Sequence, residues 1–454
     1  MIDIKIVNGK LLDMDEHRLI ETDLGIKDGK IEKIGPIEEE AKIVLDAEGA
    51  IVSPGFIDIH MHEEELHLTE DGTDISIPML RMGVTTAVTG NCGNNRQDIR
   101  ALRDVIEKRG NPVHYMSYVG HNSLREKAGN LTTLEPSTPE QIEVMRQLVN
   151  ENIEDGAIGV SFGFEYSPGT SMEEIIGVTQ DIRDRKDLLL SAHYRFDADR
   201  ALESIEEMAE ITRRTGIPFQ IAHISSLSAF GNMQEALDMI VRLREEEGLD
   251  LMVDAYPYAA FSTRIGTEVF APGCFERWGK TYSDILLTEP PYEDQPATKE
   301  TFEDARKNYP EMLAVASVMR EDEIVLALQH PLVMVASDGI YRNHKGHPRG
   351  AGTFPRFIGK YLRDDKILDF FEGMKKITRM PAERLHLKNK GEIKEGYDAD
   401  LTLFHYDTII DKADFGSTSQ EPPEGIEAVI VDGRLALHKG KLLDTKAGKY
   451  LTRR

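Results

Sequence analysis

Six side chains of the kinds that bind zinc in proteins are spread through the chain, each at or just beyond the end of a short apolar run. They are His60, His62, Cys92, His193, His223 and Asp338. Imidazole, thiolate and carboxylate groups are the common zinc ligands. A carboxylate beside a metal can also serve as a general base. The set therefore predicts metal-assisted hydrolysis, with Asp338 taking a proton from water.

Each of these residues taken alone has an ordinary structural explanation. A single histidine in a core strand is more often a hydrogen-bonded structural residue than a ligand, and a lone cysteine such as Cys92 is usually a small buried apolar side chain. Ser337-Asp338-Gly339 alone would indicate a turn. Six such residues at the ends of five strands favour a metal site. In His60-Met61-His62 the spacing adds to this, since residues i and i+2 of a strand share a face.

The apolar runs recur along the middle of the chain with amphipathic segments between them. Eight runs are visible, at residues 56–60, 83–89, 113–119, 156–161, 188–193, 219–223, 251–254 and 333–338. Residues 201–211 and 233–246 carry apolar stripes at helical spacing. Buried strands that alternate with helices predict a (β/α)8 TIM-like barrel over residues 54–391. Because active sites of such barrels lie at the carboxyl ends of the strands, we expect the six side chains to converge there.

The interval between the last two runs is longer than the others. It contains the turn-forming stretch Glu289-Pro290-Pro291-Tyr292 and continues to Pro296 in the same texture. An insertion at the carboxyl end of a strand lies above the barrel mouth, where it can close over a substrate. The sequence predicts either a lid at about residues 264–310 or a plain surface excursion.

The two ends of the chain share another texture. Residues 1–53 alternate apolar and polar residues with glycine punctuation, which predicts short antiparallel strands with tight turns at Asn8-Gly9 and Asp28-Gly29. Residues 392–454 repeat the pattern. We expect one small β-sandwich domain assembled from residues 1–53 and 392–454. Two unrelated terminal hairpins are the alternative, although isolated hairpins are only marginally stable.

Bulk composition limits the classes of partner. The 454 residues carry a formal net charge of −26, from 54 Lys+Arg against 80 Asp+Glu. This field disfavours nucleic acid and anionic membranes and leaves a small-molecule substrate. The two cysteines, Cys92 and Cys274, suggest a reducing compartment. With no signal peptide and no apolar run near the ~20 residues that span a bilayer, we expect a soluble cytoplasmic protein. The sequence does not determine its oligomeric state.

Several longer segments resemble one known family. Residues 54–62, Pro-Gly-Phe-Ile-Asp-Ile-His-Met-His, resemble the opening signature of the amidohydrolase superfamily. Segments that resemble the D-aminoacylases (N-acyl-D-amino-acid deacylases) are 83–93, 120–125, 166–169, 192–195, 254–258, 337–339, 347–349 and 352–356. The resemblance is colinear along the chain. It implies a zinc-dependent hydrolase that splits N-acyl-D-amino acids into a carboxylate and a free D-amino acid.

The resemblance also implies roles for individual residues. Cys92, His193 and His223 match the ligands of a tight zinc site, and His60, His62 and Asp338 match a second, weaker metal position. Asp338 also matches the general base that returns its proton to the leaving amine. The segments that shape the substrate pocket contain Tyr166, Tyr256, Arg349 and Arg356. An arginine fork is suited to a substrate carboxylate.

The cysteine separates this family from similar hydrolases. Hydantoinases, dihydroorotases and isoaspartyl dipeptidases bridge two metals with a carboxylated lysine from the fourth strand. Residues 156–166, which hold the fourth run here, contain no lysine. A thiolate bridge from Cys92 is therefore favoured over Glu165, the one carboxylate of that stretch, because sulfur is the softer zinc ligand.

Two departures from the family pattern lie near the ligands. Glu63-Glu64-Glu65 stands where an aspartate usually follows His-x-His, and the sixth strand reads His223-Ile224-Ser225 where a lysine usually faces the substrate carboxylate. Arg264 could supply that cation from the next loop. Without it, the alternative function is hydrolysis of a cyclic amide or of an amide that lacks an α-carboxylate. A non-catalytic binding barrel is disfavoured, since it has no use for a general base beside metal ligands.

Overall fold

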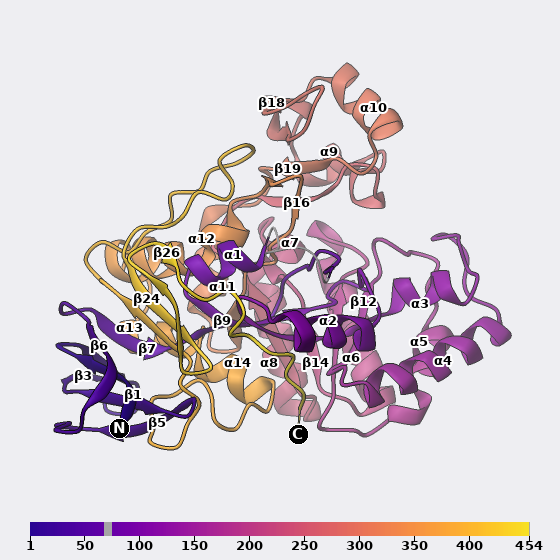
Figure 1. Cartoon of the computed structure of the whole chain (residues 1–454). Coiled ribbons are helices and arrows are strands. Elements are labelled where there is room, and N and C mark those ends of the chain that lie inside the picture. Colours follow the sequence, from indigo (N-terminus) through magenta and orange to yellow (C-terminus); the bar gives the residue numbers. More distant parts are fainter. Residues whose placement is uncertain (68–74, 454) are drawn as a thin grey trace.

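The computed structural model describes residues 1–67 and 75–453 (Figure 1). The middle of the chain forms parallel strands with helices packed around them. Strands from the two chain ends, indigo and yellow in Figure 1, lie together at one side. Within the described ranges, no helix combines the length and the apolar character needed to cross a membrane.

The eight apolar runs form parallel strands in two sheets, of order β10-β9-β8 and β11-β12-β13-β14-β15-β20. Their bounds are β8 Phe56–Asp58, β9 Val84–Thr89, β10 His114–Ser117, β11 Val119–Gly120, β12 Gly159–Gly163, β13 Leu189–His193, β14 Phe219–Ile221, β15 Leu251–Ala255 and β20 Val333–Val335. Only Tyr118 separates β10 from β11, and a parallel bridge from Met61 to Gly339 joins the first run to the last. The carboxyl ends of these strands therefore lie at the same edge.

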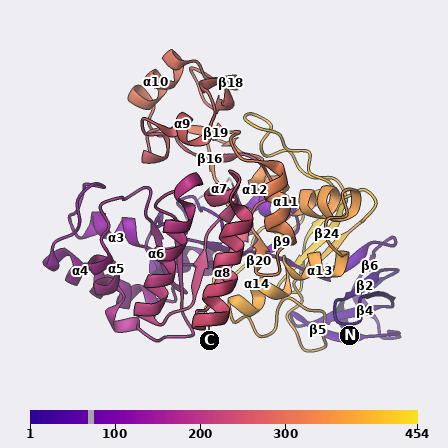
Figure 2. The same ribbon diagram turned by 180° about the vertical axis from the view of Figure 1, so that it is seen from behind.

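Amphipathic helices cover the strands. The longer ones are α2 Ile99–Arg109, α4 Pro139–Glu154, α6 Ala201–Thr215, α8 Met233–Glu247, α11 Glu321–Gln329 and α12 Arg349–Arg356, the last continued by a π-helical segment, Phe357–Asp364. The shorter ones are α1 Ser76–Arg81, α3 His121–Lys127, α5 Met172–Val178, α7 Ile224–Ser228, α13 Phe370–Lys375 and α14 Arg379–Arg384. Figure 2 shows α6 and α8, the two helices that the sequence predicts, side by side over the strands. Each ends at a left-handed glycine, Gly216 or Gly248.

The long interval between β15 and β20 forms a layer of its own. Its antiparallel sheet has the order β16-β19-β17-β18, from β16 Phe261–Arg264, β17 Ile285–Leu287, β18 Gln295–Pro296 and β19 Leu313–Ala316. Helices α9 Cys274–Trp278 and α10 Lys299–Asn308 belong to the same interval. The Trp278 ring of α9 packs on Phe261 of β16, and Phe302 of α10 packs on Phe275 of α9. In Figure 1 this layer stands above the parallel strands. Because β16 pairs with β19, the ordered unit is wider than the predicted 264–310 and runs from Phe261 to Ala316. We call it the insertion.

The terminal strands form two further sheets. One has seven strands in the order β26-β25-β24-β23-β7-β2-β3 and mixes both chain ends; the other has the order β5-β4-β1-β6. Their bounds are β1 Ile2–Val7, β2 Lys10–Asp13, β3 Arg18–Glu21, β4 Leu24–Lys27, β5 Lys30–Ile34, β6 Ala41–Asp46, β7 Ile51–Pro54, β23 Leu401–Phe404, β24 Ile426–Val431, β25 Arg434–His438 and β26 Lys441–Leu442. Asp28-Gly29 makes the predicted hairpin turn. The prediction at Asn8-Gly9 was wrong, because β1 and β2 belong to different sheets and the chain crosses between them there.

Candidate active site

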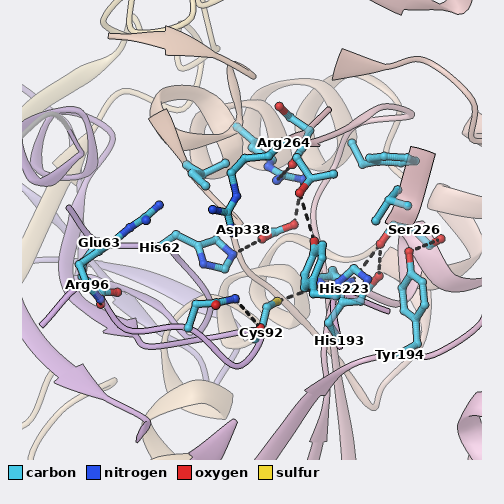
Figure 3. A pocket seen from close by; sticks show the side chains of 18 residues that line it. His62, Glu63, Cys92, Arg96, His193, Tyr194, His223, Ser226, Arg264 and Asp338 are labelled. Atoms are coloured by element: carbon cyan, nitrogen blue, oxygen red, sulfur yellow. Dashed lines mark hydrogen bonds and ion pairs between the residues drawn. The ribbon is translucent and has the colours of Figure 1, made fainter. Parts of the chain in front are cut away.

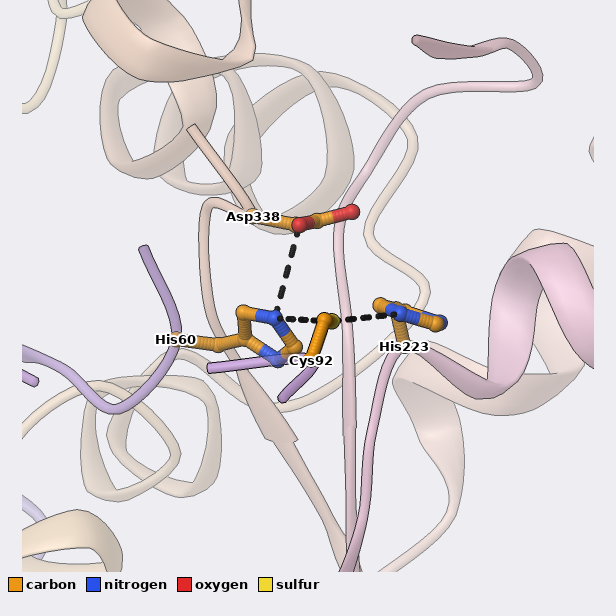
Figure 4. Close-up of side chains that lie close together, drawn as sticks. All are labelled: His60, Cys92, His223 and Asp338. Atoms are coloured by element: carbon orange, nitrogen blue, oxygen red, sulfur yellow. Dashed lines mark hydrogen bonds and ion pairs between the residues drawn. The ribbon is translucent and has the colours of Figure 1, made fainter. Parts of the chain in front are cut away.

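Four of the six predicted ligands form a tight group at the carboxyl edge of the parallel strands (Figure 4). The Sγ atom of Cys92 lies 3.4 Å from Nε2 of His60 and 3.4 Å from Nε2 of His223. Nε2 of His60 lies 3.4 Å from Oδ1 of Asp338. One ligand atom from each of the four lies within 4.8 Å of all the others, and all four side chains are buried.

The remaining two ligands lie against this group. Nδ1 of His193 is 3.0 Å from Nε2 of His223, and Nε2 of His62 is 3.0 Å from Oδ1 of Asp338. Figure 3 shows both imidazoles beside the central thiol and carboxylate. The structure thus brings together all six side chains that the sequence singles out.

Unusual backbone conformations aim three of these ligands. Cys92, His223 and Asp338 have φ angles of 53°, 33° and 48°, in the left-handed region that residues with a side chain rarely adopt. Each follows a buried strand, so a sharp turn there directs the side chain across the end of the sheet. Such conformations cost on the order of 1–3 kcal/mol each and persist only where the surroundings determine them. Three of the six predicted ligands therefore have a left-handed backbone conformation.

A polar group stands behind three of the imidazoles. The outer nitrogen of His60, Nδ1, is 3.3 Å from Oδ1 of Asp254. The outer nitrogen of His193, Nε2, is 2.9 Å from Oε2 of Glu165. Ser226 Oγ lies 2.9 Å from the outer Nδ1 of His223. Partners of this kind fix the orientation of metal-binding histidines and make the inner nitrogen more basic.

These outer partners were not predicted from the sequence. Asp254 could have been found by the same rule as the ligands, because it lies near the end of the seventh run. The sequence suggests Glu165 only as an alternative bridge between two metals. In the structure its carboxylate instead contacts His193, one of the predicted ligands. No sequence signal marks Ser226.

The departure at Glu63 has a structural explanation. Its buried carboxylate accepts hydrogen bonds from the backbone N–H groups of Gly90 and Arg96, each at 3.0 Å. These two residues flank the turn that carries Cys92. Glu63 therefore holds both sides of the cysteine loop and has a positioning role.

The electrostatics favour anionic ligands at the centre. Burial opposes ionisation of Cys92, yet His60 and His223 hold the pKa of its thiol well below the usual range. Burial likewise opposes ionisation of Asp338, and Arg349 and the histidines nevertheless hold the pKa of its carboxyl well below the usual range. The Cys92 sulfur, a carboxylate oxygen and imidazole nitrogens of four histidines lie close together. This buried donor set fits zinc.

An open cavity of about 750 Å³ lies in front of the ligands. Its walls include His62, Glu63, Cys92, Asn94, Arg96, Tyr166, His193, Tyr194, His223, Ser226, Phe261, Ser262, Thr263, Arg264, Val269, Asp338, Ile340 and Arg349. Arg349 is buried, and its Nη1 is 2.9 Å from Oδ2 of Asp338. The lining thus includes a buried cation beside the candidate base and two apolar side chains of the insertion, Phe261 and Val269.

Comparisons with known proteins agree with this geometry. A model described as the amidohydrolase family matches residues 44–316 and 306–436. The chain belongs to the amidohydrolase family. It is 29% identical to a D-aminoacylase of Alcaligenes xylosoxydans xylosoxydans, over 99% of this chain and 98% of that protein. An N-acyl-D-aspartate deacylase of the same organism is 28% identical over 95% of this chain and 91% of that protein.

Solved structures extend the comparison. A D-aminoacylase studied for its binuclear metal centre superposes with a TM-score of 0.88 at 26% identity and full coverage of both chains. An N-acyl-D-glutamate deacylase from Bordetella bronchiseptica, in complex with zinc and a phosphonate that mimics the tetrahedral intermediate, gives a TM-score of 0.87 at 27% identity over 99% of both chains. A D-hydantoinase, at 18% identity and a TM-score of 0.64, shares the fold.

The predicted substrate residues of this amidohydrolase fall into two groups. Tyr166, Arg264 and Arg349 line the cavity, whereas Tyr256 and Arg356 are not part of its lining. The Arg349 guanidinium lies over the Tyr256 ring, 4.7 Å from its centroid, so Tyr256 supports the arginine from behind. Arg356 donates to the Pro257 carbonyl at 2.9 Å and pairs with Asp411 at 3.2 Å. Its guanidinium is thus engaged in structural contacts outside the cavity.

The substitution at the sixth strand leaves no cation in its place. Ser225 is buried, and its Oγ donates to the Tyr256 carbonyl at 3.5 Å, away from the cavity lining, to which Ser226 contributes instead. Arg264 does reach the cavity. Its Nη1 is 3.0 Å from Oε2 of Glu311, and about a third of its side chain (35%) is exposed. Of the three arginines predicted to bind substrate, Arg264 and Arg349 line the cavity, and Arg349 has the more enclosed position.

Proposed function

We propose that this chain hydrolyses N-acyl-D-amino acids, with zinc held by the six-residue cluster. The observation that carries the proposal is the convergence of Cys92, Asp338 and four histidines in a cavity that also contains the buried Arg349. The relatives named above act on this substrate class and resemble the chain over nearly its whole length. Cys92, His193 and His223 would hold the tight ion, and His60, His62 and Asp338 the weaker one.

The chain's own residues support this chemistry. When bound, zinc polarises the amide carbonyl and acidifies the attacking water. Asp338 is positioned to take the proton from that water and to deliver it to the leaving nitrogen. Arg349 would supply the cation that meets the substrate carboxylate. Its Nη1 also pairs with Asp338 at 2.9 Å, and its Nη2 donates to the Ser262 carbonyl at 3.0 Å. Tyr166 and the apolar side chains of the insertion limit the access of water to the reacting amide.

We also propose a domain organisation. The parallel strands would close into a (β/α)8 barrel over residues 54–391, which the bridge from Met61 to Gly339 supports. Residues 1–53 and 392–454 would form one small β-sandwich domain, supported by a seven-stranded sheet that mixes both ends and by an apolar cluster shared between the two terminal sheets. A cytoplasmic location is also proposed, and the two unpaired cysteines support it.

A second candidate is hydrolysis of a cyclic amide or of an amide without an α-carboxylate. The observation that favours it is the serine at position 225, which leaves no lysine at the sixth strand. On this hypothesis Arg349 would only pair with Asp338 and would not contact the substrate.

The decisive experiment is a substrate panel with zinc content measured in the same samples. N-acetyl and N-formyl D- and L-amino acids are compared with hydantoins and with N-acylamines that lack the carboxylate. We expect turnover of the N-acyl-D-amino acids. Turnover of hydantoins alone, with zinc bound, would select the second candidate, and absence of bound zinc would refute both.

A further inference from the structure

The insertion reaches the site through its short helix α9. Arg277 places its Nε 2.6 Å from Oδ1 of Asp197. The indole N–H of the next residue, Trp278, donates to Oδ2 of the same carboxylate at 2.8 Å. Asp197 is 2% exposed and follows β13, the strand that ends at the ligand His193. Two consecutive residues of the insertion thus contact one buried carboxylate, which lies just after the strand that carries His193.

The same guanidinium faces a second buried carboxylate. Nη2 of Arg277 lies 3.6 Å from Oε1 of Glu165, and the other oxygen of Glu165 contacts Nε2 of His193 at 2.9 Å. Neighbouring buried carboxylates repel one another unless a cation compensates them. The planar fork of an arginine can serve two acceptors at once, which an ammonium group does less well. A continuous series of contacts therefore runs from the insertion through Glu165 to a metal ligand.

The helix that carries these residues also supports the cavity wall. The Trp278 ring packs edge to face on Phe261, with 5.5 Å between ring centroids. Phe261 and Val269 line the cavity, and Val269 accepts a hydrogen bond from Arg277 Nη2 through its carbonyl oxygen at 3.2 Å. A displacement of α9 would change the cavity wall and the contact on Glu165 together.

We propose that Arg277 and Trp278 form a latch that couples the position of the insertion to the orientation of His193. Arg277 and Glu165 are then positioning residues for that ligand, and the inference rests on the zinc site proposed above. An imidazole held from behind by a carboxylate is better oriented for its metal, and loss of such a partner weakens metal binding by about 10- to 100-fold. Closure of the insertion over the cavity and tight zinc binding accompany each other.

The chain provides its own reporter, because Trp278 is the only tryptophan. Zinc is withdrawn from the full-length protein with increasing chelator, while bound zinc and Trp278 emission are followed together. The variants are Arg277→Met, Arg277→Lys and the near-isosteric Glu165→Gln. Lys299→Met is the matched control, since Lys299 is a cation on α10 of the same insertion, with 63% of its side chain exposed. Thermal unfolding verifies that each variant is folded.

In the wild type we expect Trp278 emission to change over the same chelator range in which zinc is lost. Arg277→Met and Glu165→Gln should bind zinc about 10- to 100-fold more weakly. Arg277→Lys should recover part of that loss, and Lys299→Met should match the wild type. Zinc affinity and emission response in folded Arg277→Met equal to those of the control would overturn the latch. A wild-type chain that holds no zinc would instead refute the proposed function, and the latch with it.

Discussion

The strand ends and the insertion contribute to one cavity by different physical means. The ligands Cys92, His223 and Asp338 follow buried strands, in backbone conformations that the surrounding core determines. The insertion contributes Phe261, Val269 and Arg264 from a separate antiparallel layer. The strand ends thus contribute the predicted ligands from buried positions, and the insertion contributes part of the cavity wall.

The ion pairs of the two regions differ in exposure to solvent: the pair at the strand ends is buried, and the pair in the insertion is exposed. Arg349 and Asp338 pair in the interior, with 2% and 9% of their side chains exposed. Arg264 and Glu311 pair at the rim, with 35% and 59% exposed. Charges in a poorly hydrated interior interact strongly, whereas water and salt screen an exposed pair. Substitutions at the strand ends should therefore have much larger effects than equivalent substitutions in the insertion.

The largest effect is expected for Asp338→Asn. The amide keeps the shape of the side chain but cannot accept the proton of the attacking water. We expect kcat to fall by about 10²- to 10⁴-fold. Steady-state kinetics with zinc content measured in parallel will show this, and a fall below tenfold at full zinc occupancy would remove Asp338 from its role as base.

Arg349→Met should have the second-largest effect on activity. This variant tests whether Arg349 recognises the substrate carboxylate. Loss of one partner from a buried charge pair costs about 2–5 kcal/mol, which corresponds to roughly 30- to 5000-fold in kcat/KM. The measurement compares each N-acyl-D-amino acid with the matching N-acylamine that lacks the carboxylate. Both classes should lose rate because Arg349 pairs with Asp338. If Arg349 also holds the substrate carboxylate, the N-acyl-D-amino acids should lose more than the N-acylamines. An equal loss for both classes would mean that the arginine serves Asp338 alone.

Arg264→Gln should have a small effect on neutral substrates. Its exposed ion pair with Glu311 is worth only about 0–1 kcal/mol, so we expect KM to change by less than about fivefold. Acidic D-substrates are the informative case. A KM increase above a hundredfold for all substrates would show instead that Arg264 replaces the absent lysine, and the contrast between the two regions would fail.

Glu174→Gln should leave catalysis nearly unchanged and alter acid stability. Glu174 is buried on α5 and accepts hydrogen bonds from Arg125 at 2.6 Å and from the Ser137 N–H at 2.9 Å. Although burial alone would raise the pKa of its carboxyl, His121, Ser137 and Arg125 lower it to about 2. Because this value lies below the ordinary 4.5, the stabilisation is complete above about pH 4.5 and is lost as the pH falls toward 2.

The corresponding measurement is the free energy of unfolding as a function of pH. Glu174→Gln should be less stable than the wild type by about 3 kcal/mol at neutral pH, with the difference shrinking toward pH 2. Glu311→Gln, at the exposed rim, is the control and should show almost no difference. Equal behaviour of the two variants would contradict the contrast between buried and exposed carboxylates.

Several site residues were predictable because their positions follow a rule. Parallel strands end at one edge, so polar residues that end successive apolar runs must meet there. The rule predicts that His60, His193 and Asp338 lie at one edge of the sheet, as they do in the structure. The hairpin predicted at Asn8-Gly9 failed because local turn signals do not specify which sheet the next strand joins.

The periodic pattern of the sequence by itself determined the parallel strands, the helices over them and the six convergent ligands. The tertiary structure decided which nitrogen of each imidazole faces inward, that Glu165 stands behind His193, that Arg356 turns away from the cavity, and that Arg277 reaches from the insertion to Glu165. The physical reason is that strand and helix periods are local properties of the chain. Contacts between distant loops depend on how the separate layers pack, and no spacing in the sequence records that packing.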